Sequence, residues 1–172
     1  MILNLREFEN FPARKLLQGD HNAVDLEFDS LVSLCRIELQ LNIQKSGDEY
    51  YCQGDAKAHV KLTCARCLGE FDQDLENSTD FIICSSEWHE ANRNIIDSED
   101  YVYFQGSDLH ADLSDIVRQA IITAVSLKPL CSEDCKGLCS QCGINLNDKS
   151  CDCEKKPTDA RWEGLRKLSG LT

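Results

Sequence analysis

Hydrophobic and polar residues alternate with a period of two along two neighbouring stretches, residues 32–43 and 54–64. This alternation is typical of antiparallel strands that bury one face and expose the other. We therefore expect two half-buried strands, joined by the polar turn at residues 44–50. The residues expected on the buried face are Cys35, Ile37, Leu39, Leu41 and Ile43 in the first strand, and Ala56, Ala58, Val60, Leu62 and Cys64 in the second.

Residues 71–84 have the composition of a return strand, and residues 1–8, 23–28 and 101–106 are weaker strand candidates. The polar stretch 85–100 between them is expected to be an excursion or a mobile loop.

The hydrophobic period changes to that of a helix near residues 112–126, with Asp112 as the expected N-cap. A second, short helix is expected over residues 157–168, capped by Thr158, with Trp162 on its apolar edge. Strands therefore come first and helices later, which indicates an α+β fold. We expect an antiparallel sheet or partial barrel with one packed helix over residues 1–128, and a Cys-rich tail with a terminal helix, packed on this body, over residues 129–172.

The net charge of −12 is unevenly distributed along the 172 residues. Residues 1–117 contain nine Lys and Arg against 23 Asp and Glu, whereas residues 118–172 contain nine against seven. Nucleic-acid affinity comes largely from basic side chains that displace counterions, so any RNA contact is expected in the C-terminal third. The acidic part suits a basic protein partner, or is simply a solvated face.

A cytoplasmic protein is expected. The longest apolar run, residues 120–125, is far shorter than the roughly 20 residues of a membrane span, and the N-terminus has no pattern of a secretory signal. Eleven cysteines in a reducing compartment favour metal binding over a disulfide framework.

Eight of the eleven cysteines form four short-spaced pairs, which is the number of ligands that two all-thiolate zinc sites need. Glycines follow several pairs and are expected to supply a positive φ where the chain leaves the turn. The pairs are Cys64 with Cys67, Cys131 with Cys135, Cys139 with Cys142, and Cys151 with Cys153.

The grouping that loses least chain entropy closes the last two pairs locally and leaves the first two to share a second zinc. Other arrangements remain open: the two C-x-x-C turns can share one zinc, a single site can be filled, the thiols can serve a redox role, or the same ligands can hold an iron–sulfur cluster. The other cysteines, Cys35, Cys52 and Cys84, are expected to be small apolar residues in or beside strands.

We expect no enzyme. Catalytic zinc usually has histidine or carboxylate ligands and an open position, and the candidate ligands here are all cysteine. Only His59 lies near a pair, on the expected wet face of its strand.

Three segments together resemble the YceD family of bacterial and plastid proteins, named for large ribosomal RNA subunit accumulation. They are "LTCARCL", "LKPLCSEDCKGLCSQCGINLNDKSCDCE" and "DARWEGLRKL". The resemblance marks Cys64, Arg66, Cys67, Cys131 and Cys135 as signature positions, and residues 136–139 and 142–143 as the extended tail of one branch. The resemblance does not identify the metal, which is inferred from the spacing and chemistry of the cysteines.

The resemblance implies a non-enzymatic factor in ribosome biogenesis, for synthesis, processing or stability of large-subunit (23S) rRNA, acting on the rRNA precursor or an assembly intermediate. Alternatives are an adaptor for a basic ribosomal protein and a thiol redox protein. Arg66 can contact RNA or support the cysteine sulfurs. The candidate RNA-binding residues are Arg66, Lys136, Lys149, Lys155, Lys156, Arg166 and Lys167.

Overall fold

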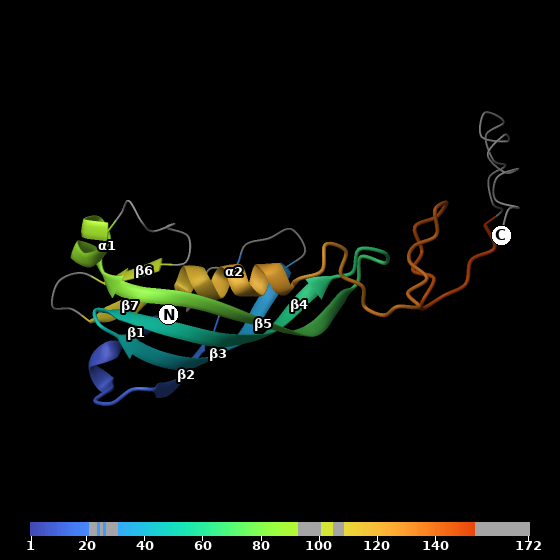
Figure 1. Cartoon of the computed structure of the whole chain (residues 1–172). Helices are drawn as coiled ribbons and strands as arrows, with labels where there is room; N and C mark the ends of the chain where they lie inside the picture. The colour runs from blue at the N-terminus through green and yellow to red at the C-terminus, as the bar shows by residue number, and fades with distance from the viewer. Residues whose placement is uncertain (21–23, 25, 27–30, 93–100, 105–108, 154–172) are drawn as a thin grey trace, which may run out of the picture.

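A computed structural model describes residues 1–20, 24, 26, 31–92, 101–104 and 109–153. Its main element is a five-stranded sheet in the order β2-β3-β4-β5-β6, which does not close into a barrel within the described residues (Figure 1). Neighbouring strands are antiparallel except β5 and β6, which are parallel. The strands are β2 (Ala13–Gly19), β3 (Leu31–Ser46), β4 (Glu49–Thr63), β5 (Glu70–Ser85) and β6 (Tyr101–Phe104).

A smaller sheet and one main helix complete the body. Strands β1 (Ile2–Asn4) and β7 (His110–Asp112) pair antiparallel, and the 3-10 helix η1 (Leu5–Glu7) follows β1. Helix α2 (Ser114–Ala124) packs against β5 and β4 (Figure 1). Its buried residues Val117, Ala120 and Ile121 join the same core as the inner faces of the long strands. The expected α+β class, with one packed helix on a mainly antiparallel sheet, is confirmed.

The predicted alternation is confirmed along most of β3 and all of β4. The expected inward residues from Ile37 to Ile43 and from Ala56 to Cys64 are all buried. Asn77 on β5 also faces this side, where its side-chain amide donates to the carbonyl oxygen of Ala120 at 2.9 Å. The second half of α2 is therefore tied to the centre of β5.

The prediction for Cys35 is wrong because β3 contains a bulge. Leu34 pairs with Val60 and Arg36 with His59, so one extra residue of β3 has no counterpart on β4. A bulge reverses the facing of the residues that precede it. Leu34 is consequently buried and Cys35 exposed.

Other boundaries differ from the sequence prediction. Strand β2 was not expected, and the polar excursion begins with a helix, α1 (Ser86–Asn92). The prediction of Asp112 as N-cap is wrong: α2 begins at Ser114 with Leu113 as its N-cap residue, and Asp112 is the last residue of β7. The Asp112 carboxylate still accepts the Ser114 backbone N–H, at 3.0 Å. Most of the candidate strand at residues 23–28, and the whole expected helix at 157–168, lie outside the described residues.

The Cys-rich segment meets the body at the turn between β4 and β5 (Figure 1). The backbone N–H of Ala65 in this turn donates to the carbonyl oxygen of Pro129 at 2.8 Å. A domain boundary near residue 128 stays a prediction. Among the described residues, no helix combines the length and apolar character needed to cross a membrane.

Candidate metal centres

The structure gathers the eight paired cysteines into two groups of four. In each group the four Sγ atoms lie within 4.8 Å of one another. We call Cys64, Cys67, Cys131 and Cys135 centre A, and Cys139, Cys142, Cys151 and Cys153 centre B. This is the grouping expected from local loop closure, and the two C-x-x-C turns do not share a site.

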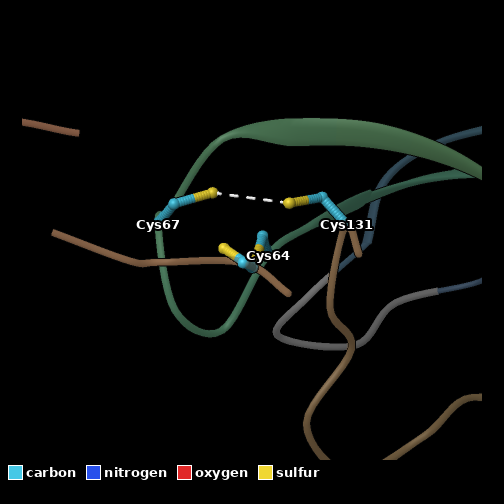
Figure 2. A group of neighbouring side chains, drawn as sticks. Cys64, Cys67 and Cys131 are labelled. Atoms are coloured by element: carbon cyan, nitrogen blue, oxygen red, sulfur yellow. Dashed lines mark hydrogen bonds between the residues drawn. The ribbon is translucent and has the colours of Figure 1, made fainter. Parts of the chain in front are cut away.

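The sulfur spacing of centre A fits a tetrahedral metal. Zinc lies about 2.3 Å from each thiolate, and a regular tetrahedron of that radius has sulfur–sulfur edges of about 3.8 Å. The Sγ atoms of Cys67 and Cys131, joined by the dashed line in Figure 2, are 3.8 Å apart. Those of Cys64 and Cys135 are also 3.8 Å apart. A disulfide would need about 2.05 Å. The donor set therefore fits a thiophilic ion such as zinc.

The first half of centre A is a knuckle formed by the turn after β4. The Cys64 N–H donates to the Gly69 carbonyl at 2.9 Å, and the Leu68 N–H donates back to the Cys64 carbonyl at 3.0 Å. The Arg66 N–H points at Cys64 Sγ at 3.4 Å. We expected Gly69 to take the left-handed conformation after this pair, but Leu68, one position earlier, takes it instead, with φ 58°. This expectation was wrong for the first turn.

The knuckle of centre B repeats this pattern nearly atom for atom. The Cys139 N–H donates to the Ile144 carbonyl at 2.8 Å, and the Gly143 N–H donates to the Cys139 carbonyl at 2.9 Å. The Gln141 N–H points at Cys139 Sγ at 3.4 Å. Gly143 takes φ 71°, as expected of a glycine in this place. Two segments more than 70 residues apart thus fold into the same ligand-presenting turn.

Arg66 holds the second half of centre A against the first. Its guanidinium Nη1 donates to the carbonyl oxygens of Glu133 and Cys135, both at 3.1 Å. Gly137 lies directly against this turn with φ 73°, and a Cβ atom there would be 3.2 Å from the Arg66 carbonyl oxygen. The guanidinium therefore binds backbone carbonyls of the neighbouring loop, and only the Arg66 backbone N–H faces a sulfur.

The thiol pKa values within each centre are spread widely. Burial opposes deprotonation of Cys64, yet backbone N–H donors, that of Cys67 foremost, lower the pKa of Cys64 to about 6. The N–H groups of Cys142 and Gln141 lower the pKa of Cys139 to about 6.

The partners of these two thiols behave in the opposite way. Hydrogen bonding with the Cys135 sulfur raises the pKa of Cys131 to about 12. Hydrogen bonding with the Cys142 sulfur raises the pKa of Cys153 to about 12. Four adjacent sulfurs resist becoming four anions, and a divalent cation among them removes that resistance.

The two centres differ in burial. Cys64, Cys67 and Cys135 are buried and pack with Phe71 and Leu130 in a small cluster of their own. In centre B, Cys142 and Cys153 are exposed. A metal in centre A would be sheltered by the end of the sheet, whereas one in centre B would lie near solvent.

The remaining cysteines lie outside both centres. Burial raises the pKa of the Cys52 thiol to about 12, and burial with the nearby charge of Glu49 raises that of Cys84 to about 11. His59 is on the outer face of β4, with its Nδ1 2.7 Å from Asp74 Oδ1. Cys52 and Cys84 are therefore buried thiols, as expected, and His59 lies on the wet face.

One residue of the site was missed by the sequence analysis. The side-chain amide of Asn147 donates to Cys135 Sγ at 3.3 Å, from within the loop that joins the two ligand pairs of centre B. The only signal in the sequence was a pair of amides, Asn145 and Asn147, in that loop, and nothing in the spacing connects them to Cys135.

The candidate RNA-binding residues are only partly described. The side chains of Lys136 and Lys149 are exposed on the tail, and Arg66 is engaged as above. Lys155, Lys156, Arg166 and Lys167 lie outside the described residues.

Comparison with known proteins places these features in a family. The chain is 33% identical over 98 residues to an Arabidopsis thaliana protein, the chloroplastic large ribosomal RNA subunit accumulation protein YCED homolog 1, covering 57% of this chain and 28% of the relative. It is 39% identical over 76 residues to the Zea mays protein of the same name, covering 44% of this chain and 25% of the relative. The chain thus spans about a quarter of the length of these relatives. No solved structure matches.

The family described as large ribosomal RNA subunit accumulation protein YceD matches residues 52–169. That stretch is more than half of the chain and contains both knuckles and all eight cysteines of centres A and B. The chain belongs to the YceD family.

Proposed function

We propose that this chain is a non-enzymatic factor that supports the synthesis, processing or stability of large-subunit (23S) rRNA during ribosome biogenesis, with one structural zinc ion in each of centres A and B. The family match over residues 52–169 carries the rRNA part of the proposal. Two relatives are named for large ribosomal RNA subunit accumulation.

The chemistry of the donor sets supports a structural role for the metal. Each centre offers four thiolates, which completes a tetrahedron and leaves no position for a substrate or an activated water. Catalytic zinc needs that open position and a nearby general base. Structural zinc sites contribute roughly 10–16 kcal/mol in small domains, enough to hold a segment with little core of its own. We infer that zinc fixes residues 131–153 against the β4–β5 turn.

Charge suggests how the chain meets RNA. The tail is slightly basic and the body strongly acidic, so contacts with phosphates would be made by lysines of the tail such as Lys136 and Lys149. Arg66 acts instead as a support for centre A, because its guanidinium already binds two carbonyls. Lys155, Lys156, Arg166 and Lys167 extend the basic tail in this proposal.

The direct test is complementation. In a host that lacks its own family member, expression of this chain should restore the ratio of large-subunit to small-subunit rRNA, measured on total RNA. The variant C64S/C67S, which cannot fill centre A, should fail, whereas C35S should restore the ratio fully, because Cys35 lies outside both centres. An unchanged ratio with the wild-type chain, expressed at the level of the native protein, would contradict the proposal.

A second candidate is an adaptor for a basic ribosomal protein, and the outer face of β5 favours it. Five exposed carboxylates alternate along that face, and within the described part of the chain two of them pair with basic side chains: Glu76 with Lys57 at 2.8 Å, and Asp74 with His59 at 2.7 Å. Capture of partners with and without ribonuclease separates the candidates, since an adaptor keeps its protein partner after RNA is digested. The carboxylates are Glu70, Asp72, Asp74, Glu76 and Asp80.

A further inference from the structure

Centres A and B are joined by a short antiparallel ribbon. Cys135 of centre A and Cys139 of centre B stand at the two ends of one five-residue segment. This segment pairs with residues 144–147: the Leu146 N–H donates to the Gly137 carbonyl at 2.9 Å, and Leu138 bridges to Asn145. Residues 144–147 belong to the loop between Cys142 and Cys151, which are both candidate ligands of centre B. The order of this loop therefore depends on centre B.

Asn147 extends the ribbon into centre A. Its Oδ1 accepts the backbone N–H of Lys136 at 2.8 Å, which fixes the orientation of the amide. The amide nitrogen then faces Cys135 Sγ at 3.3 Å and Asn145 Oδ1 at 2.8 Å. The backbone N–H of Asn147 also donates to Asn145 Oδ1, at 3.0 Å, so the residue is held at both its main chain and its side chain.

From this arrangement we infer that the two centres bind metal cooperatively and that Asn147 is the positioning residue that couples them. The inference rests on the proposed occupancy of both centres by zinc. A hydrogen bond to a metal-bound thiolate stabilises the anion and orients it, and removal of such a partner typically costs 10–100-fold in metal affinity. Here the partner is supplied to centre A by a loop that centre B holds in place.

The coupling must act in both directions. If a filled centre B raises the zinc affinity of centre A by some factor, then a filled centre A raises that of centre B by the same factor. The structural reason for the reverse effect is visible in the ribbon: a metal in centre A fixes Cys135, and with it the strand on which residues 144–147 pair. Partial loss of zinc would loosen the whole of residues 131–153 together.

The test uses the full chain and zinc itself, titrated in competition with a chromophoric chelator. Four proteins are compared: the wild type, C139S/C142S without centre B, C64S/C67S without centre A, and N147A, which keeps all eight thiols. D148A is the matched control, because Asp148 is exposed in the same loop and its only described hydrogen bond comes from its backbone N–H. Replacement of zinc by Co²⁺ gives a second readout, the sulfur-to-cobalt charge-transfer band.

We expect loss of centre B to weaken zinc binding at centre A by about tenfold or more, and loss of centre A to weaken centre B by the same factor. N147A should weaken zinc binding at centre A and reduce the mutual factor, while the backbone pairing between Leu138 and Asn145 keeps part of the coupling. N147A should also shift the charge-transfer band to longer wavelength, because the sulfur loses a donor, while D148A leaves both readouts unchanged.

Two failures are distinguishable. If the wild-type protein binds two zinc ions, and each centre has the same affinity when the other centre is removed, the coupling is overturned but both metal centres are retained. Wild-type protein that takes up no zinc overturns the metal centres, and the coupling with them. If the double-serine variants do not fold, an N147A affinity and spectrum identical to those of D148A overturn the role of Asn147.

Discussion

Replacement of Arg66 tests whether this side chain supports centre A or contacts RNA. Its Nη1 donates to two backbone carbonyls of residues 133 and 135, both at 3.1 Å. A hydrogen bond of this kind contributes about 1 kcal/mol net, so R66A should lose about 2 kcal/mol of the free energy that docks the loop on the knuckle. Because the loop carries Cys131 and Cys135, that loss should appear as weaker zinc binding at centre A, by about thirtyfold.

The assay is competition for zinc between the full chain and a chelator, with R36A as control. Arg36 is also exposed, but it lies on β3, where it pairs with Glu38 on the outer face of the sheet. R66K should be intermediate, since an ammonium group keeps the charge but not the planar geometry of the guanidinium. If R66A instead retains zinc as R36A does while its affinity for precursor rRNA falls, Arg66 is an RNA contact and does not support centre A.

Three further predictions concern thiols, pH and backbone. In the zinc-loaded protein only Cys35 should react rapidly with a thiol reagent, and chelation should make the eight cysteines of centres A and B reactive as well. Cys52 and Cys84 should react only on unfolding, because burial raises the pKa values of both thiols. Many fast-reacting thiols before chelation would favour the redox alternative. Zinc affinity, measured by competition, should rise with pH across the neutral range, because zinc must displace protons from Cys131 and Cys153, whose pKa values are raised to about 12. The affinity should fall steeply below about pH 6, where Cys64 and Cys139 also become protonated. An affinity that does not change with pH would contradict this. Gly137→Ala should destabilise the tail more than Gly143→Ala, as measured by zinc retention in denaturant. Both residues have a positive φ, which costs an L residue about 1–2 kcal/mol, but only at Gly137 would the new Cβ also lie 3.2 Å from a backbone oxygen. Equal effects of the two substitutions would show that this crowding is relieved by a small shift.

The sheet was predictable where one face of a strand is buried along its whole length. The period of two runs through β4 and on to Cys64, the residue after the strand, so the facing of its side chains followed directly from the sequence. The same reasoning failed at Cys35, because a bulge inserts a residue without changing the composition around it. Strand β2 was missed because its inner residues are only half-buried, which leaves a weak alternation.

The ligand groups were predictable because short spacings restrict which thiols can meet, and the loss of chain entropy favours local closure. The supporting contacts were not. Arg66 donates to the carbonyl of Glu133, and the Asn147 amide donates to Cys135 Sγ. Both contacts depend on how the backbone folds around the centres, and no periodic pattern in the sequence indicates them. At the first knuckle even the left-handed residue, Leu68, contradicts the usual preference for glycine.

The most direct test is the zinc content of the natively purified chain, followed by hydrogen exchange before and after the metal is stripped. We expect two zinc ions per chain, and protection of residues 131–153 that is lost when the metal is stripped, while β3, β4 and β5 stay protected. A chain that carries no metal, yet already protects residues 131–153, would contradict this expectation.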